Sequence, residues 1–152
     1  MKAIVFTQYG SPDVLRLEEV EKPTPNDGQA LVKIYAAAAN PLDWHLMRAK
    51  PFLVRLGGGF WRPKVPRLGA DIAGVIEAVG KDVTEFKPGD AVFGSIGAGG
   101  FAEYACAAEK HLAHKPANVS FEAAAATPVV GFTAIQGLRD LGHIQPGEKV
   151  LI

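Results

Sequence analysis

The chain has 152 residues, 48% of them hydrophobic and 21% charged, which is the composition of one soluble globular domain with a core of its own. Its 16 Lys and Arg residues balance 16 Asp and Glu residues, and this zero net charge argues against nucleic acid as a partner. The single cysteine, Cys106, excludes an intrachain disulfide framework and a zinc site built from several thiolates.

The first third of the chain predicts short strands separated by turns. Residues 2–6 predict a strand and not a signal peptide, because no long apolar run with a cleavage site follows the start. A second strand is expected around Leu17 and a third over residues 30–35, with a loop rich in Pro at 23–28 between them. No stretch approaches the roughly 18 apolar residues that span a bilayer, so we expect no membrane partner and a cytoplasmic location.

The middle of the chain continues this pattern around one long loop. Residues 51–66 mix Pro, Gly and aromatic residues without a period and predict an irregular loop, and such loops are more often functional than accidental. Residues 71–79 predict a buried strand, with Gly74 where a side chain would collide with a neighbour. Short strands at this spacing favour a barrel-like or sandwich architecture. The later predicted strands cover residues 91–94, 101–107 and 112–115.

The pattern changes from strand to helix near Ser120, which predicts the N-cap of a short helix. Thr127 followed by Pro128 predicts an N-cap and first turn of a longer helix, and Gly142 predicts its end. Residues 149–152 then begin an apolar strand without a continuation, so we expect a truncated ending.

Six groups of short motifs follow one another in a fixed order. Any one of them is a weak signal, whereas six in order are a strong one. They comprise residues 40–44 (Asn-Pro-Leu-Asp-Trp), 66–76 with 79–80, 86–92, 99–104, 123–125 with 131–134, and 146–152. On these motifs essentially the whole chain resembles the medium-chain dehydrogenase/reductase superfamily, on its zinc-independent, quinone-oxidoreductase-like branch.

The resemblance implies a mainly β fold with some α. A GroES-like β-barrel domain would cover residues 1–119, and residues 120–152 would hold connecting helices and the first strand of a truncated nucleotide-binding domain of the Rossmann type. In the family, a glycine-rich loop that binds the pyrophosphate of NADPH or NADH follows that strand. The glycines at 57–59 and 97–100 do not replace this loop, because neither group opens a helix after a buried strand.

The residues at the family's zinc positions predict that no metal is bound. Zinc-dependent relatives usually place Cys where this chain has Asn40, and a His-Glu pair where it has Ala70-Asp71. An amide and a methyl group cannot replace a thiolate and an imidazole as zinc ligands. His111 and His114 would point to opposite faces of a predicted strand, which does not suit shared ligation.

The resemblance places Asn40 beside the nicotinamide and the substrate, where its amide N–H could hydrogen-bond a carbonyl or developing enolate oxygen. From the residues alone, Asn40-Pro41 favours a simple turn, and it is the family match that favours the role in the site. Asp43 could orient Asn40 or a water molecule, or cap a short helix over residues 42–47. His45 could supply the proton, as solvent could, but a solvent-facing helical His is the simpler account.

Thr133 matches a family position that hydrogen-bonds the nicotinamide end of the cofactor, although its hydroxyl could equally bond to the helix carbonyl one turn earlier. Phe52, Phe60 and Trp61 would form an apolar wall of a substrate pocket suited to quinones and enones. The alternative is a loop folded over the barrel or against a partner subunit, which would make the protein a homodimer. Cys106 is interpreted as a small buried hydrophobe.

The function predicted from these residues is the N-terminal part of a zinc-independent NAD(P)H-dependent oxidoreductase that reduces quinones, enones or related carbonyl compounds. We expect the isolated chain to be inactive, since the pyrophosphate loop lies outside it. The alternative is a stand-alone GroES-like binding or assembly module without enzymatic activity. Residues 143–152 separate the two hypotheses, because an unpartnered Rossmann strand should fray or pair with a neighbouring copy.

Overall fold

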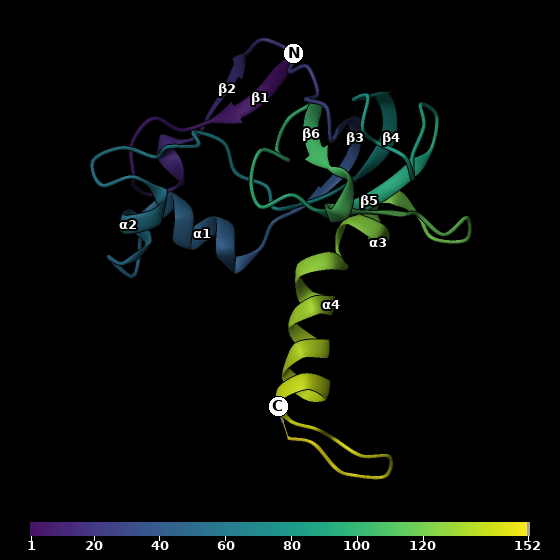
Figure 1. The fold of residues 1–152 in the computed structure, drawn as a ribbon. Coiled ribbons are helices and arrows are strands. Elements are labelled where there is room, and N and C mark those ends of the chain that lie inside the picture. The colour runs from purple at the N-terminus through teal and green to yellow at the C-terminus, as the bar shows by residue number, and fades with distance from the viewer. Residues whose placement is uncertain (152) are drawn as a thin grey trace.

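The computed structural model describes residues 1–151 and contains two antiparallel sheets with helices at their margins (Figure 1). The smaller sheet pairs β1 with β2, and the larger has five strands in the order β6-β3-β4-β5-β7. The strands are β1 (Lys2–Val5), β2 (Arg16–Glu19), β3 (Gln29–Ala38), β4 (Asp71–Val79), β5 (Ala91–Ser95), β6 (Tyr104–Ala108) and β7 (Leu112–His114). The α-helices are α1 (Pro41–Arg48), α2 (Val54–Gly58), α3 (Phe121–Ala125) and α4 (Pro128–Ile135), and the other helical segments are η1 (Pro12–Val14), η2 (Glu109–His111) and the π-helical η3 (Gln136–Leu141).

β3 and β4 form the centre of the larger sheet and of its core. β-Branched side chains dominate this core because they suit the extended backbone and pack well on a pleated surface. Gly74 lets β3 approach β4 closely, since a Cβ at this position would lie 2.0 Å from the carbonyl oxygen of Lys33. This confirms the collision predicted for that position. The largest fully buried hydrophobic side chains of this sheet are Val32, Ile72, Ile76 and Val92.

The larger sheet is open in the part of the chain that the structure describes, which corrects the predicted barrel. β6 and β7 are its two edge strands and do not pair with each other. A barrel closes only when its first and last strands pair. Single bridges between Ala3 and Ala102 and between Val5 and Arg67 attach the small sheet to neighbouring segments without closing the larger one. The larger sheet is therefore antiparallel and open.

The loop over residues 51–66 contains a short helix, α2, where the sequence predicts irregular structure throughout. The helix forms because the N–H groups of Val54 and Arg55 reach back to the carbonyls of Pro51 and Phe52, both at 3.0 Å. It ends at Gly59, which has φ 113°, a left-handed conformation that glycine adopts without strain.

The C-terminal helices begin near the predicted residues. The Ser120 hydroxyl accepts a hydrogen bond from the Ala123 N–H at 3.2 Å, which confirms it as the N-cap of α3. Thr127 precedes α4 as predicted, but its hydroxyl donates to the Ala123 carbonyl at 2.8 Å and does not cap α4. That part of the prediction is wrong, because the preceding helix ends close enough to compete for the hydroxyl. Gly142 follows the end of the helical segment, as predicted.

α4 extends away from the sheets, and the chain ends beyond it (Figure 1). Residues 149–151 form no strand, so the predicted Rossmann strand is not evident, and Ile152 lies outside the described residues. In residues 1–151 no helix has both the length and the hydrophobicity needed to cross a membrane.

Candidate functional site

A cavity of about 590 Å³ lies between the start of α1 and one face of α4. Asn40 lines it from the α1 side and Thr133 from the α4 side. The structure therefore brings together the two residues for which the resemblance implies contact with the nicotinamide. The rest of its lining is apolar or small and consists of Pro41, Leu42, Val129, Val130, Ala134, Gly137 and Leu138.

Asn40 occupies the N-cap of α1 in an extended conformation, with φ −118° and ψ 158°. Pro41 follows at the first helical position, where its fixed φ suits a helix start and its missing N–H costs no hydrogen bond. The Asn40 side chain is buried, with 8% of the residue exposed. A rigid turn between β3 and α1 thus holds Asn40 at the edge of the cavity.

Asp43 fixes this turn with both of its carboxylate oxygens. Oδ2 accepts the Asn40 backbone N–H at 2.8 Å, as the third helical residue of a capping box does. Oδ1 accepts the N–H of Gly69 at 2.7 Å, which ties α1 to the segment preceding β4. Asp43 thus holds the backbone of Asn40 and caps α1, the two structural roles that the sequence left open.

Asp71 is a residue of this site that the sequence analysis missed. It is fully buried, and its Oδ2 accepts hydrogen bonds from Nδ2 of Asn40 at 3.2 Å and from the backbone N–H of Val129 at 3.0 Å. No described residue donates a hydrogen bond to its Oδ1. A buried acceptor without a donor costs about 1–3 kcal/mol. The signal that could have identified Asp71 was a carboxylate at the start of a strand predicted to be buried.

The Asn40 amide is turned toward Asp71. Besides its hydrogen bond to that carboxylate, Nδ2 lies 3.5 Å from the carbonyl oxygen of Ala38. Both contacts use the donor side of the amide. The suggestion that Asn40 donates to a developing oxyanion stays a prediction, and it requires one N–H to be released from these protein acceptors.

The Thr133 hydroxyl donates to the Val129 carbonyl one helical turn earlier, at 2.7 Å. This is the helix-bonding alternative considered from the sequence, and it coexists with a place in the cavity wall. Because the hydroxyl gives its proton to the helix, its oxygen remains available as an acceptor.

His45 lies toward the other end of α1 and is not among the residues lining the cavity. Its Nδ1 lies 2.6 Å from the carbonyl oxygen of Lys50, and its ring meets Trp44 edge-on at 4.9 Å between centroids. The hydrogen bond holds the ring against the chain that leaves α1. The role of His45 as a proton donor stays a prediction.

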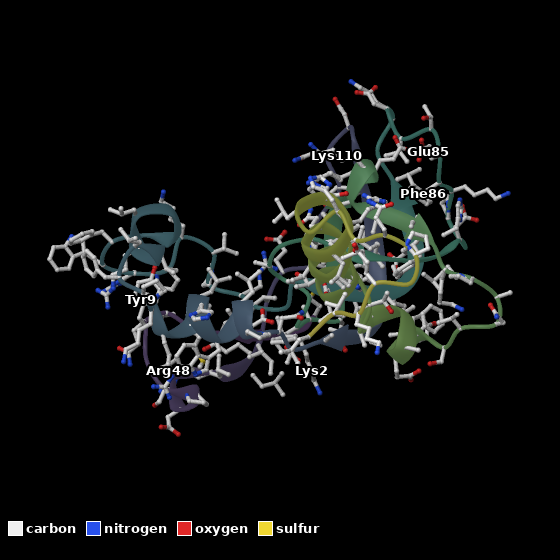
Figure 2. All side chains as sticks on the ribbon, turned by 90° about the horizontal axis from the view of Figure 1, so that it is seen from below. Lys2, Tyr9, Arg48, Glu85, Phe86 and Lys110 are labelled. Atoms are coloured by element: carbon white, nitrogen blue, oxygen red, sulfur yellow. The ribbon has the colours of Figure 1, made fainter. Side chains whose placement is uncertain are left out.

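Phe52, Phe60 and Trp61 form a chain of edge-to-face rings, with centroids 5.7 Å and then 5.0 Å apart. Trp61 is 82% exposed, and none of the three residues lines the cavity beside Asn40. The Tyr9 hydroxyl donates a hydrogen bond to the Gly59 carbonyl in this loop at 2.7 Å. Figure 2 shows that Tyr9 lies to one side of α4. Their role as a substrate wall stays a prediction.

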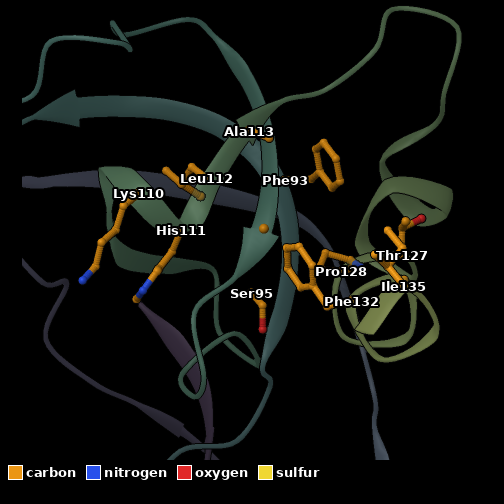
Figure 3. A pocket seen from close by; sticks show the side chains of 12 residues that line it. Phe93, Ser95, Lys110, His111, Leu112, Ala113, Thr127, Pro128, Phe132 and Ile135 are labelled. Atoms are coloured by element: carbon orange, nitrogen blue, oxygen red, sulfur yellow. The ribbon is translucent and has the colours of Figure 1, made fainter. Parts of the chain in front are cut away.

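A second cavity, of about 420 Å³, lies on another face of α4 against β5 and β7 (Figure 3). Figure 3 shows the rings of Phe93 and Phe132 in its wall and His111 at its margin. His111 belongs to the short helix η2 and only His114 to β7, so the prediction that both lie on one strand is wrong. This cavity contains none of the predicted site residues.

Side chains that could bind a metal do not cluster in residues 1–151, where no three His, Cys, Asp or Glu side chains lie close enough together to hold a metal ion. Cys106 is half-buried, and burial raises the pKa of its thiol while Arg67 opposes the effect. The thiol is therefore not activated as a nucleophile, although Cys106 is half-buried where the sequence predicted a buried side chain.

Comparison with known proteins identifies the family. Residues 26–117 match the alcohol dehydrogenase GroES-like domain, and the chain belongs to this family, on the quinone oxidoreductase-like branch of the medium-chain dehydrogenase/reductase superfamily. It is 37% identical to the quinone oxidoreductase of Homo sapiens, matching 100% of this chain and 45% of that protein. It is 41% identical to the 2-methylene-furan-3-one reductase of Solanum lycopersicum, with 100% of this chain and 40% of that protein covered.

Solved structures agree with this assignment. The quinone oxidoreductase from Coxiella burnetii superimposes with a TM-score of 0.84 at 34% identity, over 96% of this chain and 46% of that one. The Escherichia coli quinone oxidoreductase, solved in complex with NADPH, gives 0.85 at 29% identity, over 97% and 43%. The chain thus spans less than half the length of these relatives.

Proposed function

We propose that the chain is the N-terminal, substrate-side part of an NAD(P)H-dependent oxidoreductase that acts without zinc on quinones, enones or related carbonyl compounds. The observation that carries this proposal is the convergence of Asn40 and Thr133 on one mainly apolar cavity. A small-molecule substrate and a cytoplasmic location belong to the same proposal.

The residues of the cavity fit the nicotinamide end of the cofactor. A flat aromatic ring suits walls such as those formed by Leu42, Val130 and Leu138. The Thr133 oxygen can accept a hydrogen bond, which suits a ligand that carries N–H donors such as a carboxamide. When bound, the cofactor supplies a hydride. The chain's own part is to hold the ring between α1 and α4 and to exclude water with apolar side chains.

Independence from zinc is supported by the side chains at the family's ligand positions. The Asn40 amide is buried and hydrogen-bonded to Asp71, and Ala70 is fully buried with only a methyl group to offer. Neither supplies the N or S donor that zinc prefers. Hydrogen bonds must then polarise the substrate carbonyl, and the proton would come from solvent or from His45.

The aromatic rings of Phe52, Phe60 and Trp61 are proposed to border the entrance on the substrate side, where exposed apolar surface can meet a quinone. The rival role for this loop is a contact between two copies of the chain in a homodimer. The oligomeric state of the Trp61→Ser variant separates the two, because a dimer contact would weaken while an entrance wall would not affect assembly.

The nicotinamide site can be tested with reduced nicotinamide mononucleotide, which lacks the adenylate half of the cofactor. Nitrogen–proton correlation spectra of the isolated chain should show weak binding, with shifts concentrated at Asn40, Leu42 and Thr133. The same chain should not oxidise NADPH with a quinone above the uncatalysed rate. Shifts that avoid the cavity, or none at saturating ligand, would contradict the proposal and favour the stand-alone binding module.

A further inference from the structure

We propose that Asp71 is a positioning residue that turns the Asn40 amide so that the cavity receives a hydrogen-bond acceptor and not a donor. This inference rests on the proposed function and specifies the chemistry of its ligand. The group bound beside Asn40 would be a hydroxyl or N–H donor, in contrast to the oxyanion considered from the sequence.

The geometry gives Asp71 control over both walls of the cavity. Its Oδ2 accepts a hydrogen bond from Nδ2 of Asn40, on the α1 wall, at 3.2 Å. The same oxygen accepts a hydrogen bond from the N–H of Val129, on the α4 wall, at 3.0 Å. Asn40 and Val129 both line the cavity, whereas Asp71 lies behind them and is fully buried. One oxygen atom therefore joins the two elements between which the ligand is proposed to bind.

The chemistry of a carboxylate explains the orientation of the amide. The two ends of an Asn amide have nearly the same shape but opposite hydrogen-bonding character. The Asp71 oxygen acts as an acceptor here, so only the nitrogen end of Asn40 can face it favourably. Nδ2 also faces the Ala38 carbonyl, a second acceptor. The oxygen end is consequently directed away from these acceptors, and its lone pairs are what a cavity ligand meets.

Stability alone does not account for a carboxylate at this position. Oδ1 of Asp71 is buried and has no hydrogen-bond donor among the described residues. An uncompensated acceptor of this kind opposes folding, and in native proteins it calls for an explanation. Asp43, the other buried carboxylate of the site, uses both of its oxygens. The contrast favours a role for Asp71 in controlling Asn40, in addition to its contact with the first turn of α4.

Asp71→Asn is the sharpest variant, because it keeps the size and one acceptor of Asp71 but also offers a donor. Asn40 can then pair with residue 71 in either orientation. We expect the affinity for reduced nicotinamide mononucleotide to fall about 10-fold, the effect of losing one well-placed hydrogen bond. The side-chain amide signals of Asn40 should shift in the free protein as well, which a purely structural role would not require.

A double-mutant cycle with Asn40→Ala shows whether Asp71 acts through Asn40. If it does, Asp71→Asn should have no further effect on ligand affinity in the Asn40→Ala background. Glu77→Gln is the matched control, since it makes the same acid-to-amide change on β4 at an exposed position and should leave affinity unaltered. Equal losses in both backgrounds, or unchanged affinity and unchanged Asn40 signals, would overturn the inference.

A direct measurement on the unmodified chain covers the case in which Asp71→Asn does not fold. A scalar coupling across the hydrogen bond between Nδ2 of Asn40 and the carboxyl carbon of Asp71 should be detectable, and its absence would overturn the assigned orientation. Failure of the proposed function is distinguishable from failure of this inference. If the mononucleotide does not bind, the proposed function fails, while the coupling and the free-protein amide signals still decide the orientation of Asn40.

Discussion

β4 and α4 are both apolar segments of similar length, but they differ in what covers them. In β4, Ile72 is fully buried between β3 and β5, whereas in α4 Ile135 is 47% exposed and Phe132 is 59% exposed. Only Pro128, at the first turn of α4, is buried. The strand is therefore stabilised by its own domain, and the helix is held mainly at its N-terminal end.

The difference matters because the candidate site uses both regions. Asp71 begins β4 and reaches the first turn of α4 through Val129, so the buried end of the helix is tied to the sheet. Thr133 lies one turn further along, where α4 is exposed. The matched segment makes up less than half of the relatives' length, for example 45% of the human quinone oxidoreductase.

The largest effect should come from glycine substitutions in the two regions. Gly74→Ala places a Cβ 2.0 Å from the Lys33 carbonyl oxygen and should destabilise the fold by about 4 kcal/mol or more, at the upper end of single-residue effects. Gly137→Ala, in the helical segment after α4, meets no atom within 4 Å and should stabilise the helix by up to about 1 kcal/mol. Urea unfolding of both variants measures the contrast. Similar stabilities would show that β3 can move away from β4.

A second contrast uses the same side chain in both regions. Ile72→Ala should cost about 3 kcal/mol, because it leaves a cavity in a fully buried core. Ile135→Ala should cost about 0.5 kcal/mol or less, as substitutions at exposed positions do. Thermal unfolding followed by circular dichroism gives both values. A large loss for Ile135→Ala would mean that this face of α4 is covered in solution, for example by a second copy of the chain.

Two aspartates extend the comparison to polar contacts. Asp43→Ala leaves the N–H groups of Asn40 and Gly69 without their acceptor and should cost about 2–3 kcal/mol. Asp140→Ala removes an exposed partner of Arg139 and should change stability by less than about 0.5 kcal/mol. Chemical denaturation tests both variants. If Asp43→Ala matched Asp140→Ala, water would have to replace the lost acceptor at the start of α1.

The smallest effect concerns pH and the exposed ion pair between Lys22 and Glu77. The hydrogen bond from Lys22 lowers the pKa of the Glu77 carboxyl, with burial opposing and the lysine charge adding to the effect. A lowered folded-state pKa means that this stabilisation is present above the unfolded-state pKa and is lost as pH falls through the folded-state value. The melting temperature of the unmodified chain should slightly exceed that of Glu77→Gln at neutral pH, and the two should converge in acid. If the difference in melting temperature stayed the same from neutral to acid pH, the ion pair could not be its cause.

Much of the secondary structure was predictable because it depends on neighbours in the chain. The strand over residues 71–79, the cap at Ser120 and the proline at the start of α4 follow from periodicity and from groups within one helical turn. The helix α2 was missed because its apolar and glycine residues show no period, although the turn after Pro51 starts it. The predicted barrel failed for another reason, since closure depends on which strands meet and no local pattern records that.

The candidate site likewise has features that the local sequence determines and features that only the tertiary structure determines. By itself the sequence indicated a turn at Asn40-Pro41, placed Thr133 on a helix, and showed a resemblance to quinone oxidoreductases, because these depend on residue type and order. Only the tertiary structure decided that Asn40 and Thr133 share a cavity, and that Asp71 joins partners 31 and 58 positions away. The physical reason is that a hydrogen bond forms between atoms about 3 Å apart in space, whatever their separation along the chain.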